Sequence, residues 1–227
     1  DLANADLVIE AVFENMEIKK TVFSTLNQTV RADAILATNT SYLNINEIAA
    51  VVDNPGRVLG MHFFSPANVM PLLEIVRAAK TRPEVLATVL KLAKTIRKTG
   101  AVAGVCHGFI GNRMLSGYGH EAHMLVLEGA RPEQVDRALY EFGMPMGVIA
   151  MADLAGIDIG YRLRQQLDQS AYDVRTSYVS DRLVEMGRLG QKTGAGTYDY
   201  KAGDRTPIPS PVTARLIAEA AEKFSIK

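Results

Sequence analysis

The sequence predicts an α/β region followed by an all-α region. Over roughly the first hundred residues, short apolar runs rich in β-branched residues alternate with segments of helical spacing. After Gly108 the pattern is helical, apart from a loose stretch from Ala202 to Pro211 that is rich in glycine, proline and charge. The strand-like runs lack regular polar alternation, which indicates a sheet covered by helices on both faces. Because such sheets bind ligands at the carboxyl ends of their strands, we expect functional residues there.

Local signals predict the individual elements. The strand-like runs are 7–13, 34–38, 57–63, 72–76 and 101–105. In the first region, helices are expected from Met16 to about Val30, from the capping-box pair Asn44 and Glu47 to about Val52, and from Pro83 to near Lys98, with Gly100 as the stop. In the second region the expected helices are 109–128, 132–142, 147–168, 177–187 and 211–224.

Composition and charge argue against several classes of protein. The 227 residues carry 25 basic and 25 acidic side chains, so no net charge attracts nucleic acid. The longest apolar stretches, such as 7–13, are far shorter than the roughly 18 residues of a membrane-spanning helix. The single cysteine, Cys106, excludes an intramolecular disulfide and a multi-cysteine zinc site. We therefore expect a cytoplasmic protein with no membrane span, no nucleic-acid partner and no metal site.

Two glycine-containing motifs resemble nucleotide loops but lie in the wrong context. No G-x-G-x-x-G turn precedes the helix at Met16, and the match at 117–122 falls inside a helical run. The segment 190–194, Gly-Gln-Lys-Thr-Gly, lacks the earlier glycine that a phosphate-binding P-loop requires. Neither segment predicts a nucleotide site.

Polar residues occur where the predicted strands end. Glu14 follows the first strand, Thr38-Asn39-Thr40-Ser41 closes the second, and His62-Phe63-Phe64-Ser65-Pro66 closes the third. These three sets are expected to meet on one rim of the sheet. Glu74 lies inside the next apolar run, where a carboxylate needs a cation or a hydrogen-bond donor. We expect His62 to be that partner, at about 2.6–3.2 Å.

Each of these residues also has a purely structural interpretation. His62 could be a structural histidine at a strand end whose ring nitrogens are hydrogen-bonded within the protein, and Ser41 could be a turn residue. Asn112 could simply cap a helix, and Lys192 could be a solvated turn lysine. A thiolate–imidazole pair of Cys106 and its neighbour His107 is disfavoured, because adjacent residues on extended chain point to opposite faces.

Several specific motifs occur in a fixed order along the chain. They are Ala5–Glu14, Thr38–Ser41, Gly60–Pro66, Gly108–Arg113, Phe142–Gly147 and Gly190–Tyr198. In this order they resemble the 3-hydroxyacyl-CoA dehydrogenase family, and most closely the dehydrogenase part of multifunctional fatty-acid β-oxidation proteins. The resemblance covers nearly the whole chain, and His-Phe-Phe-x-Pro with a glutamate twelve positions after its histidine is highly specific.

The resemblance implies a fold and an activity. The expected activity is NAD-dependent oxidation of (S)-3-hydroxyacyl-CoA to 3-ketoacyl-CoA. The expected fold is the C-terminal part of a Rossmann-like dinucleotide-binding domain in residues 1–107, followed by the family's helical C-terminal domain in residues 108–202. Residues 203–227 would form a linker and the start of a further helical segment.

The resemblance also implies roles for single residues. His62 is expected to remove the hydroxyl proton while Glu74 orients its ring and balances its charge, which agrees with general acid–base chemistry. Ser41 and Asn112 match substrate-positioning residues. Because Asn112 opens the helical domain, the reaction is expected in the cleft between the domains.

The cofactor-binding residues implied by the resemblance belong to one half of an NAD site. They are Ala11, Glu14, Lys19, Ser41, Ser65 and Lys192. Ser65 departs from the asparagine of many family members. The resemblance further implies that the opening strands of the dinucleotide domain, with their glycine-rich turn, are missing at the N-terminus. We therefore expect these 227 residues alone to bind NADH weakly.

Two alternative functions remain open for this chain, one without catalysis and one with a different substrate. The chain could be a non-catalytic assembly module or a fragment without full NAD binding, in which the strand-end residues have only turn chemistry. It could also be another two-domain dehydrogenase, but those generally use a lysine base, and no lysine occupies the equivalent position. The chain has all four residues that match the family's site, and their joint presence favours the 3-hydroxyacyl-CoA assignment. They are Ser41, His62, Glu74 and Asn112.

We predict a homodimer formed through the helical domain, with a thiolase subunit as a further partner in a parent complex. The apolar residues after Pro132, from Val135 to Met151, would form a patch that a twofold contact covers. The interface is expected between residues 130 and 190 and should bury over about 1,200 Å². Light scattering measures the mass in solution, and a monomer at tens of micromolar would contradict the prediction.

Overall fold

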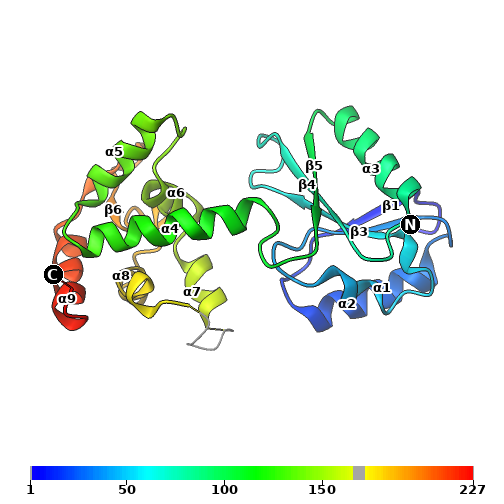
Figure 1. Cartoon of the computed structure of the whole chain (residues 1–227), viewed down its shortest axis with the longest axis horizontal. Helices are drawn as coiled ribbons and strands as arrows, with labels where there is room; N and C mark the ends of the chain where they lie inside the picture. The colour runs from blue at the N-terminus through cyan, green and yellow to red at the C-terminus, as the bar shows by residue number, and fades with distance from the viewer. Residues whose placement is uncertain (1, 166–171, 227) are drawn as a thin grey trace. The chain divides into compact units, whose positions relative to one another are not determined.

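The structure, a computed structural model, describes residues 2–165 and 172–226. The chain forms two compact units, Asp1–Leu115 and Ser116–Lys227 (Figure 1). The first contains a five-stranded sheet with helices, and the second is mainly helical. The predicted fold class, an α/β region followed by a helical region, is confirmed.

The sheet of the first unit has the strand order β1-β2-β3-β4-β5. Its strands are β1 (Leu7–Glu10), β2 (Ile35–Thr38), β3 (Val58–Phe63), β4 (Leu72–Arg77) and β5 (Thr99–Gly104). Neighbouring strands are parallel except β3 and β4, which pair in antiparallel fashion. The reason is the connection: residues 64–71 form an irregular loop without a helix, so the chain returns directly beside β3.

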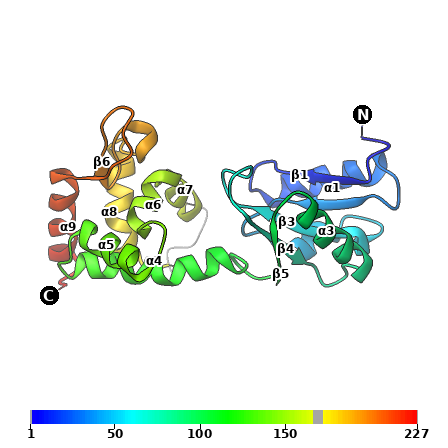
Figure 2. The same ribbon diagram turned by 90° about the horizontal axis from the view of Figure 1, so that it is seen from above.

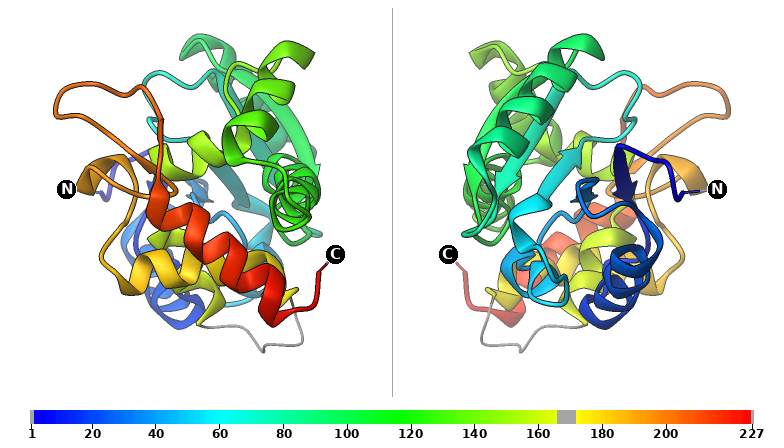
Figure 3. Two further views of the ribbon diagram at one scale, coloured as in Figure 1. Left: turned by 90° about the vertical axis from the view of Figure 1, so that its left-hand side faces the viewer. Right: turned by 90° about the vertical axis from the view of Figure 1, so that its right-hand side faces the viewer.

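Helices cover both faces of this sheet, as the sequence predicts (Figures 1 and 3). They are α1 (Met16–Thr29), α2 (Ile45–Ala49) and α3 (Pro83–Thr95), with a 3-10 turn, η1 (Pro55–Arg57), before β3. Phe23 and Ile48, from α1 and α2, pack in one apolar core, and Val89 of α3 packs in the other. The side chains of Asn15 and Asn44 cap α1 and α2 by accepting hydrogen bonds from backbone N–H groups.

The end of α3 differs from the prediction. The helix ends at Thr95, and Gly100, the expected stop, lies inside β5. Arg97 adopts a left-handed conformation with φ of 60°, and the N–H of Lys98 donates to the carbonyl of Ala93 at 2.8 Å. This closes the last turn before any glycine is reached.

The second unit contains most of the predicted helices. They are α4 (Gly111–Leu127), which begins in the first unit, α5 (Pro132–Phe142), α6 (Val148–Ala155), α7 (Asp158–Arg164), α8 (Val174–Glu185) and α9 (Pro211–Lys223). The helix predicted over 147–168 is wrong as a single element. It breaks at Gly156, whose φ is 100°, and the N–H of Ile157 donates to the carbonyl of Leu189 instead. Positions 166–168 of that prediction lie outside the described residues.

A small β-ribbon in this unit was not predicted. Strand β6 (Tyr198–Asp199) pairs with β7 (Ile208–Pro209), and a 3-10 turn, η3 (Gln191–Thr193), precedes it. Two-residue strands are too short for a periodicity to reveal them. Helix α8 contacts α9 (Figures 2 and 3), and Leu183 and Leu216 join these two helices in a buried core with Ile157. Within the described part of the chain, no helix has the length and apolarity needed to cross a membrane.

We predict that Gly60→Ala destabilises the first unit. A Cβ atom on Gly60 would lie 2.5 Å from Cδ1 of Ile45 and 2.9 Å from Cβ of Val76, so this tightly packed region must shift. Overpacking of this kind lowers the free energy of unfolding by about 1–3 kcal/mol. The matched control is Gly104→Ala in β5, where a Cβ meets nothing within 4 Å. Urea denaturation measures both, and equal losses would contradict the packing argument.

Candidate active site

A buried histidine–glutamate pair lies at the centre of the sheet. His62 of β3 and Glu74 of β4 are direct cross-strand partners, so their side chains project from the same face. Nδ1 of His62 lies 2.6 Å from Oε2 of Glu74. The residues are 4% and 0% exposed. The predicted contact is confirmed, and the hairpin between the strands explains the spacing of twelve residues.

Glu74 uses its second oxygen to hold the start of α4. The N–H groups of Ile110 and Gly111 donate to Oε1 at 3.0 and 2.7 Å. Left-handed conformations at Gly108 and Phe109, with φ of 69° and 46°, precede these donors. The carboxylate therefore has partners on both oxygens and fixes the point at which α4 begins.

The ring of His62 is held by its neighbours. It packs against the rings of Phe64 and Phe109, with centroid distances of 4.6 and 5.8 Å. Opposite a carboxylate, which only accepts hydrogen bonds, the proton of a neutral ring resides on Nδ1. This leaves Nε2 as a proton acceptor in a fixed orientation.

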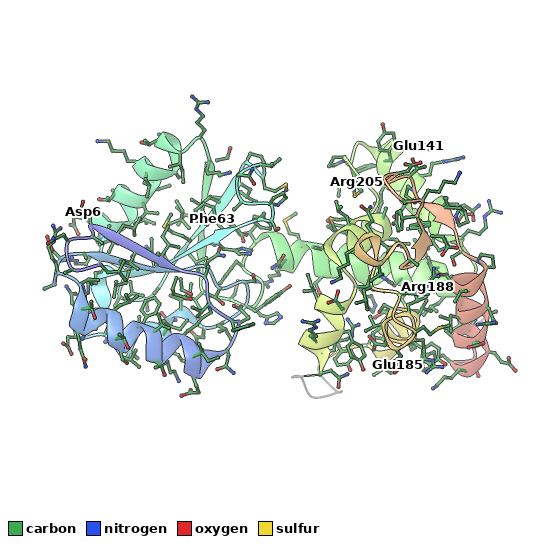
Figure 4. The ribbon with its side chains drawn as sticks, turned by 180° about the vertical axis from the view of Figure 1, so that it is seen from behind. Asp6, Phe63, Glu141, Glu185, Arg188 and Arg205 are labelled. Atoms are coloured by element: carbon green, nitrogen blue, oxygen red, sulfur yellow. The ribbon has the colours of Figure 1, made fainter. Side chains whose placement is uncertain are left out.

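The strand ends that were expected to converge are joined by hydrogen bonds. After β1, Oε1 of Glu14 accepts from the Thr40 hydroxyl at 2.6 Å and from the N–H groups of Ser41 and Tyr42 at 2.9 Å each. After β2, Oδ1 of Asn39 accepts from the N–H of Phe63 at 2.9 Å. Phe63, labelled in Figure 4, is the last residue of β3. The rim of the sheet is thus one hydrogen-bonded unit.

A buried ammonium lies beneath this rim. Lys19 is 0% exposed, and its Nζ donates to both oxygens of Glu10 at 3.0 Å and to the carbonyl of Val12 at 3.3 Å. Oε2 of Glu14 is 3.9 Å away. Lys19 was expected among the cofactor-binding residues, but its ammonium is enclosed by protein groups. Sequence reasoning missed Glu10, although an acid in an apolar run is the signal that identified Glu74.

The other residues predicted to bind substrate or cofactor lie outside the His62–Glu74 pair and are spread over both units. Ala11 and Ser65 are exposed after the ends of β1 and β3. Asn112 is half-buried in the first turn of α4. Lys192 belongs to the second unit, where its ammonium pairs with the buried carboxylate of Asp158. Arg162 also pairs with Asp158, at 3.3 Å.

The glycines around Lys192 allow close packing against Asp153. A Cβ on Gly190 would lie 2.2 Å from the carbonyl oxygen of Asp153, and one on Gly196 would lie 2.2 Å from its Oδ1. The Asp153 carboxylate accepts from the N–H groups of Thr197 and Tyr198 at 2.8 and 2.9 Å. Burial raises the pKa of Asp153, against the effect of these donors. The glycine pattern therefore reflects packing around a buried acid.

A second carboxylate, the half-buried Asp136, joins α5 to α6 and β6. Its oxygens accept from the N–H groups of Ile149 and Ala150 at 2.9 Å each and from the Tyr198 hydroxyl at 2.8 Å. Burial, followed by the charge of Asp136, raises the pKa of Tyr198, so its hydroxyl stays a donor. Arg188, labelled in Figure 4, binds the β6–β7 ribbon. It donates to the carbonyl of Gly196 at 3.0 Å and to Oδ1 of Asp199 at 2.7 Å.

We predict that Tyr198→Phe lowers the free energy of unfolding of the second unit by about 1.5–3 kcal/mol, the contribution of a hydrogen bond to a charged group. The matched control is Tyr140→Phe on the exposed part of α5, which should change it by less than about 0.5 kcal/mol. Chemical denaturation followed by circular dichroism measures both. Equal effects would show that the Asp136 contact adds nothing.

Comparisons with known proteins match both units. Residues 1–106 match the family model "3-hydroxyacyl-CoA dehydrogenase, NAD binding domain", and residues 108–200 match the C-terminal domain of the same family. A peroxisomal bifunctional enzyme of Cavia porcellus is 44% identical over all of this chain and 33% of that protein. The chain thus spans about a third of the length of the curated relatives it matches.

Solved structures agree with these matches. A 3-hydroxybutyryl-CoA dehydrogenase of Escherichia coli has 38% identity and a TM-score of 0.80, over 91% of this chain and 44% of that one. An (S)-3-hydroxybutyryl-CoA dehydrogenase of Ralstonia eutropha has 34% identity and a TM-score of 0.77, over 86% of this chain and 71% of that one. The chain therefore belongs to the 3-hydroxyacyl-CoA dehydrogenase family of oxidoreductases, and its residues 1–106 belong to that family's NAD-binding domain.

Proposed function

We propose that the protein oxidises (S)-3-hydroxyacyl-CoA to 3-ketoacyl-CoA with NAD, as a step of fatty-acid β-oxidation. The observation that carries this proposal is the buried contact of 2.6 Å between Nδ1 of His62 and Glu74. In this pair His62 is a base whose Nε2 remains available to accept a proton. The carboxylate of Glu74 stabilises the positive charge that then forms on the imidazole ring. Membership of the family supports the substrate class.

In the proposed reaction, Nε2 of His62 takes the proton of the substrate's 3-hydroxyl group. The O–H and C3–H bonds break and the C3–O bond becomes a carbonyl. NAD, when bound, would supply the acceptor for the hydride that leaves C3. The imidazolium formed on His62 is balanced by Glu74, which stays in place because Ile110 and Gly111 hold its other oxygen. Ser41 and Asn112 position the substrate through their hydroxyl and carboxamide groups.

The groups at the strand ends fit an NAD site. Ala11 and Ser65 are exposed at the edge of the parallel strands where nucleotides bind in such sheets. Glu14 and Ser41 lie on the same rim, joined by a hydrogen bond. We assign these residues to cofactor binding, whereas the enclosed ammonium of Lys19 is bound by Glu10 and by the carbonyl of Val12. For Lys192, which lies in the second unit, the role implied by the family stays a prediction.

The setting of the reaction is also part of the proposal. Relatives include peroxisomal enzymes, so the cytoplasmic location stays a prediction. The homodimer, the thiolase partner and the domain limits at residues 107 and 202 stay predictions as well. The multifunctional relatives favour a longer parent protein in which this activity is one of several.

The test uses the full-length gene product. We predict that His62→Gln lowers kcat for NADH formation by about 10²–10⁴-fold, because it removes the base. Glu74→Gln should give a comparable loss with the fold retained. Its amide oxygen still accepts from Gly111, but its NH₂ group donates to Nδ1, which moves the ring proton to Nε2 and blocks the base.

The matched control is Glu84→Gln on α3, which should keep wild-type kcat. Steady-state assays with 3-hydroxyacyl-CoA, together with circular dichroism, provide the measurement. Wild-type turnover by His62→Gln would remove this residue from the mechanism. An inactive wild-type protein would favour the alternative of a non-catalytic assembly module.

A further inference from the structure

We propose that Glu10 is a positioning residue for Ser41 and acts through Lys19 and Glu14. Neither the family resemblance nor the catalytic pair assigns a role to Glu10. The inference rests on the proposed function to the extent that Ser41 positions the substrate. Its structural part, the placement of the turn Thr40–Tyr42, is independent of that role.

The first link is between Glu14 and the turn. A single oxygen, Oε1, receives the Thr40 hydroxyl and the backbone N–H groups of Ser41 and Tyr42. These bonds hold the backbone on both sides of the Ser41 side chain. Hydrogen bonds to an ionised acceptor are about twice as strong as neutral ones, so the turn depends on the position and charge of this carboxylate.

The second link is between Glu14 and Lys19, and the third is between Lys19 and Glu10. The ammonium of Lys19 is 0% exposed and lies closer to Glu10, at 3.0 Å, than to Glu14, at 3.9 Å. Glu10 is itself 6% exposed and also accepts from the N–H of Val12 at 3.0 Å. A buried ammonium needs a close counter-charge, and Glu10 provides it.

This arrangement explains why Glu14 remains directed at the turn. If the charge of Glu10 is removed, Glu14 becomes the remaining carboxylate beside the enclosed ammonium of Lys19. The attraction between unlike charges in a water-poor environment then draws Glu14 toward Lys19. This movement takes Oε1 away from Ser41 and Tyr42. Glu10 thus determines the placement of Ser41 without touching a ligand.

The first experiment measures the turn directly in the full-length protein. Glu10→Gln keeps the shape of the side chain and removes its charge. Amide hydrogen exchange, followed by mass spectrometry, should become at least about tenfold faster for Ser41 and Tyr42, which corresponds to about 1.4 kcal/mol. The amides of Ile110 and Gly111, bound to Glu74, are the internal control and should exchange as in the wild type. Unchanged exchange at Ser41 and Tyr42 would overturn the proposal.

The second experiment is a double-mutant cycle on turnover. Glu10→Gln should lower kcat at saturating NAD by roughly 10–10²-fold, because a small displacement of a positioning group has effects of this size. In the Ser41→Ala background, Glu10→Gln should cause little further loss, since both changes remove the same interaction. Additive losses would contradict the proposal. The matched control is Glu17→Gln, an exposed acid on α1 paired with Lys20, which should keep wild-type kcat.

Turnover and NADH affinity together distinguish placement of Ser41 from a role in cofactor binding. If NADH affinity falls while kcat at saturating cofactor is unchanged, the three charged groups serve the cofactor alone and the inference is wrong. If Ser41→Ala keeps wild-type turnover, the proposed role of Ser41 fails, and the exchange experiment still decides the placement of the turn. If Glu10→Gln does not fold, Glu10→Asp replaces it, because the shorter side chain moves the carboxylate away from Lys19. Exchange at Ser41 and Tyr42 should again become faster than in the wild type, and unchanged exchange would overturn the proposal.

Discussion

The antiparallel pairing of β3 with β4 is the constraint on which the candidate site depends. This pairing brings His62 and Glu74 directly opposite each other on one face of the sheet. A shift of the register by one residue would move Glu74 to the opposite face and break the contact. The same register presents the second oxygen of Glu74 to Ile110 and Gly111, so one strand pairing places the base, its partner and the start of α4.

Carboxylates act as anchors for irregular backbone throughout the molecule. Glu74 holds the segment before α4, and Glu14 holds the Thr40–Tyr42 turn. Asp153 binds backbone N–H groups in the segment after η3, and Asp136 binds those at the start of α6. Each accepts backbone N–H groups that have no partner in a regular ladder, which satisfies buried donors where helices and strands end. Loops around the site can therefore be ordered without regular secondary structure.

Much of the molecule could be predicted from local signals. The strands of the sheet follow from apolar runs, the cap at Asn44 from its capping-box pattern, and the pairing of His62 with Glu74 from an acid inside an apolar run. The break at Gly156 could not be predicted, because helical spacing continues across it and the competing partner, Leu189, is distant in sequence. The strands β6 and β7 are too short to show a periodicity. The chain turns after α3 at Arg97, a residue type that rarely adopts a left-handed conformation, so no glycine marks the end of the helix.

The sequence by itself determined the order of strands and helices in the first unit, the family and the chemical character of the rim, because periodicity and motifs are local properties of the chain. Only the tertiary structure decided the direction of β4, the enclosure of Lys19 and the contact of Glu14 with the Ser41 turn. These features depend on groups that are distant along the chain and meet only when the sheet is assembled. A lysine such as Lys19 has the same local pattern whether its ammonium faces a ligand or a buried acid. Its environment is therefore set by packing and by the desolvation of its charge.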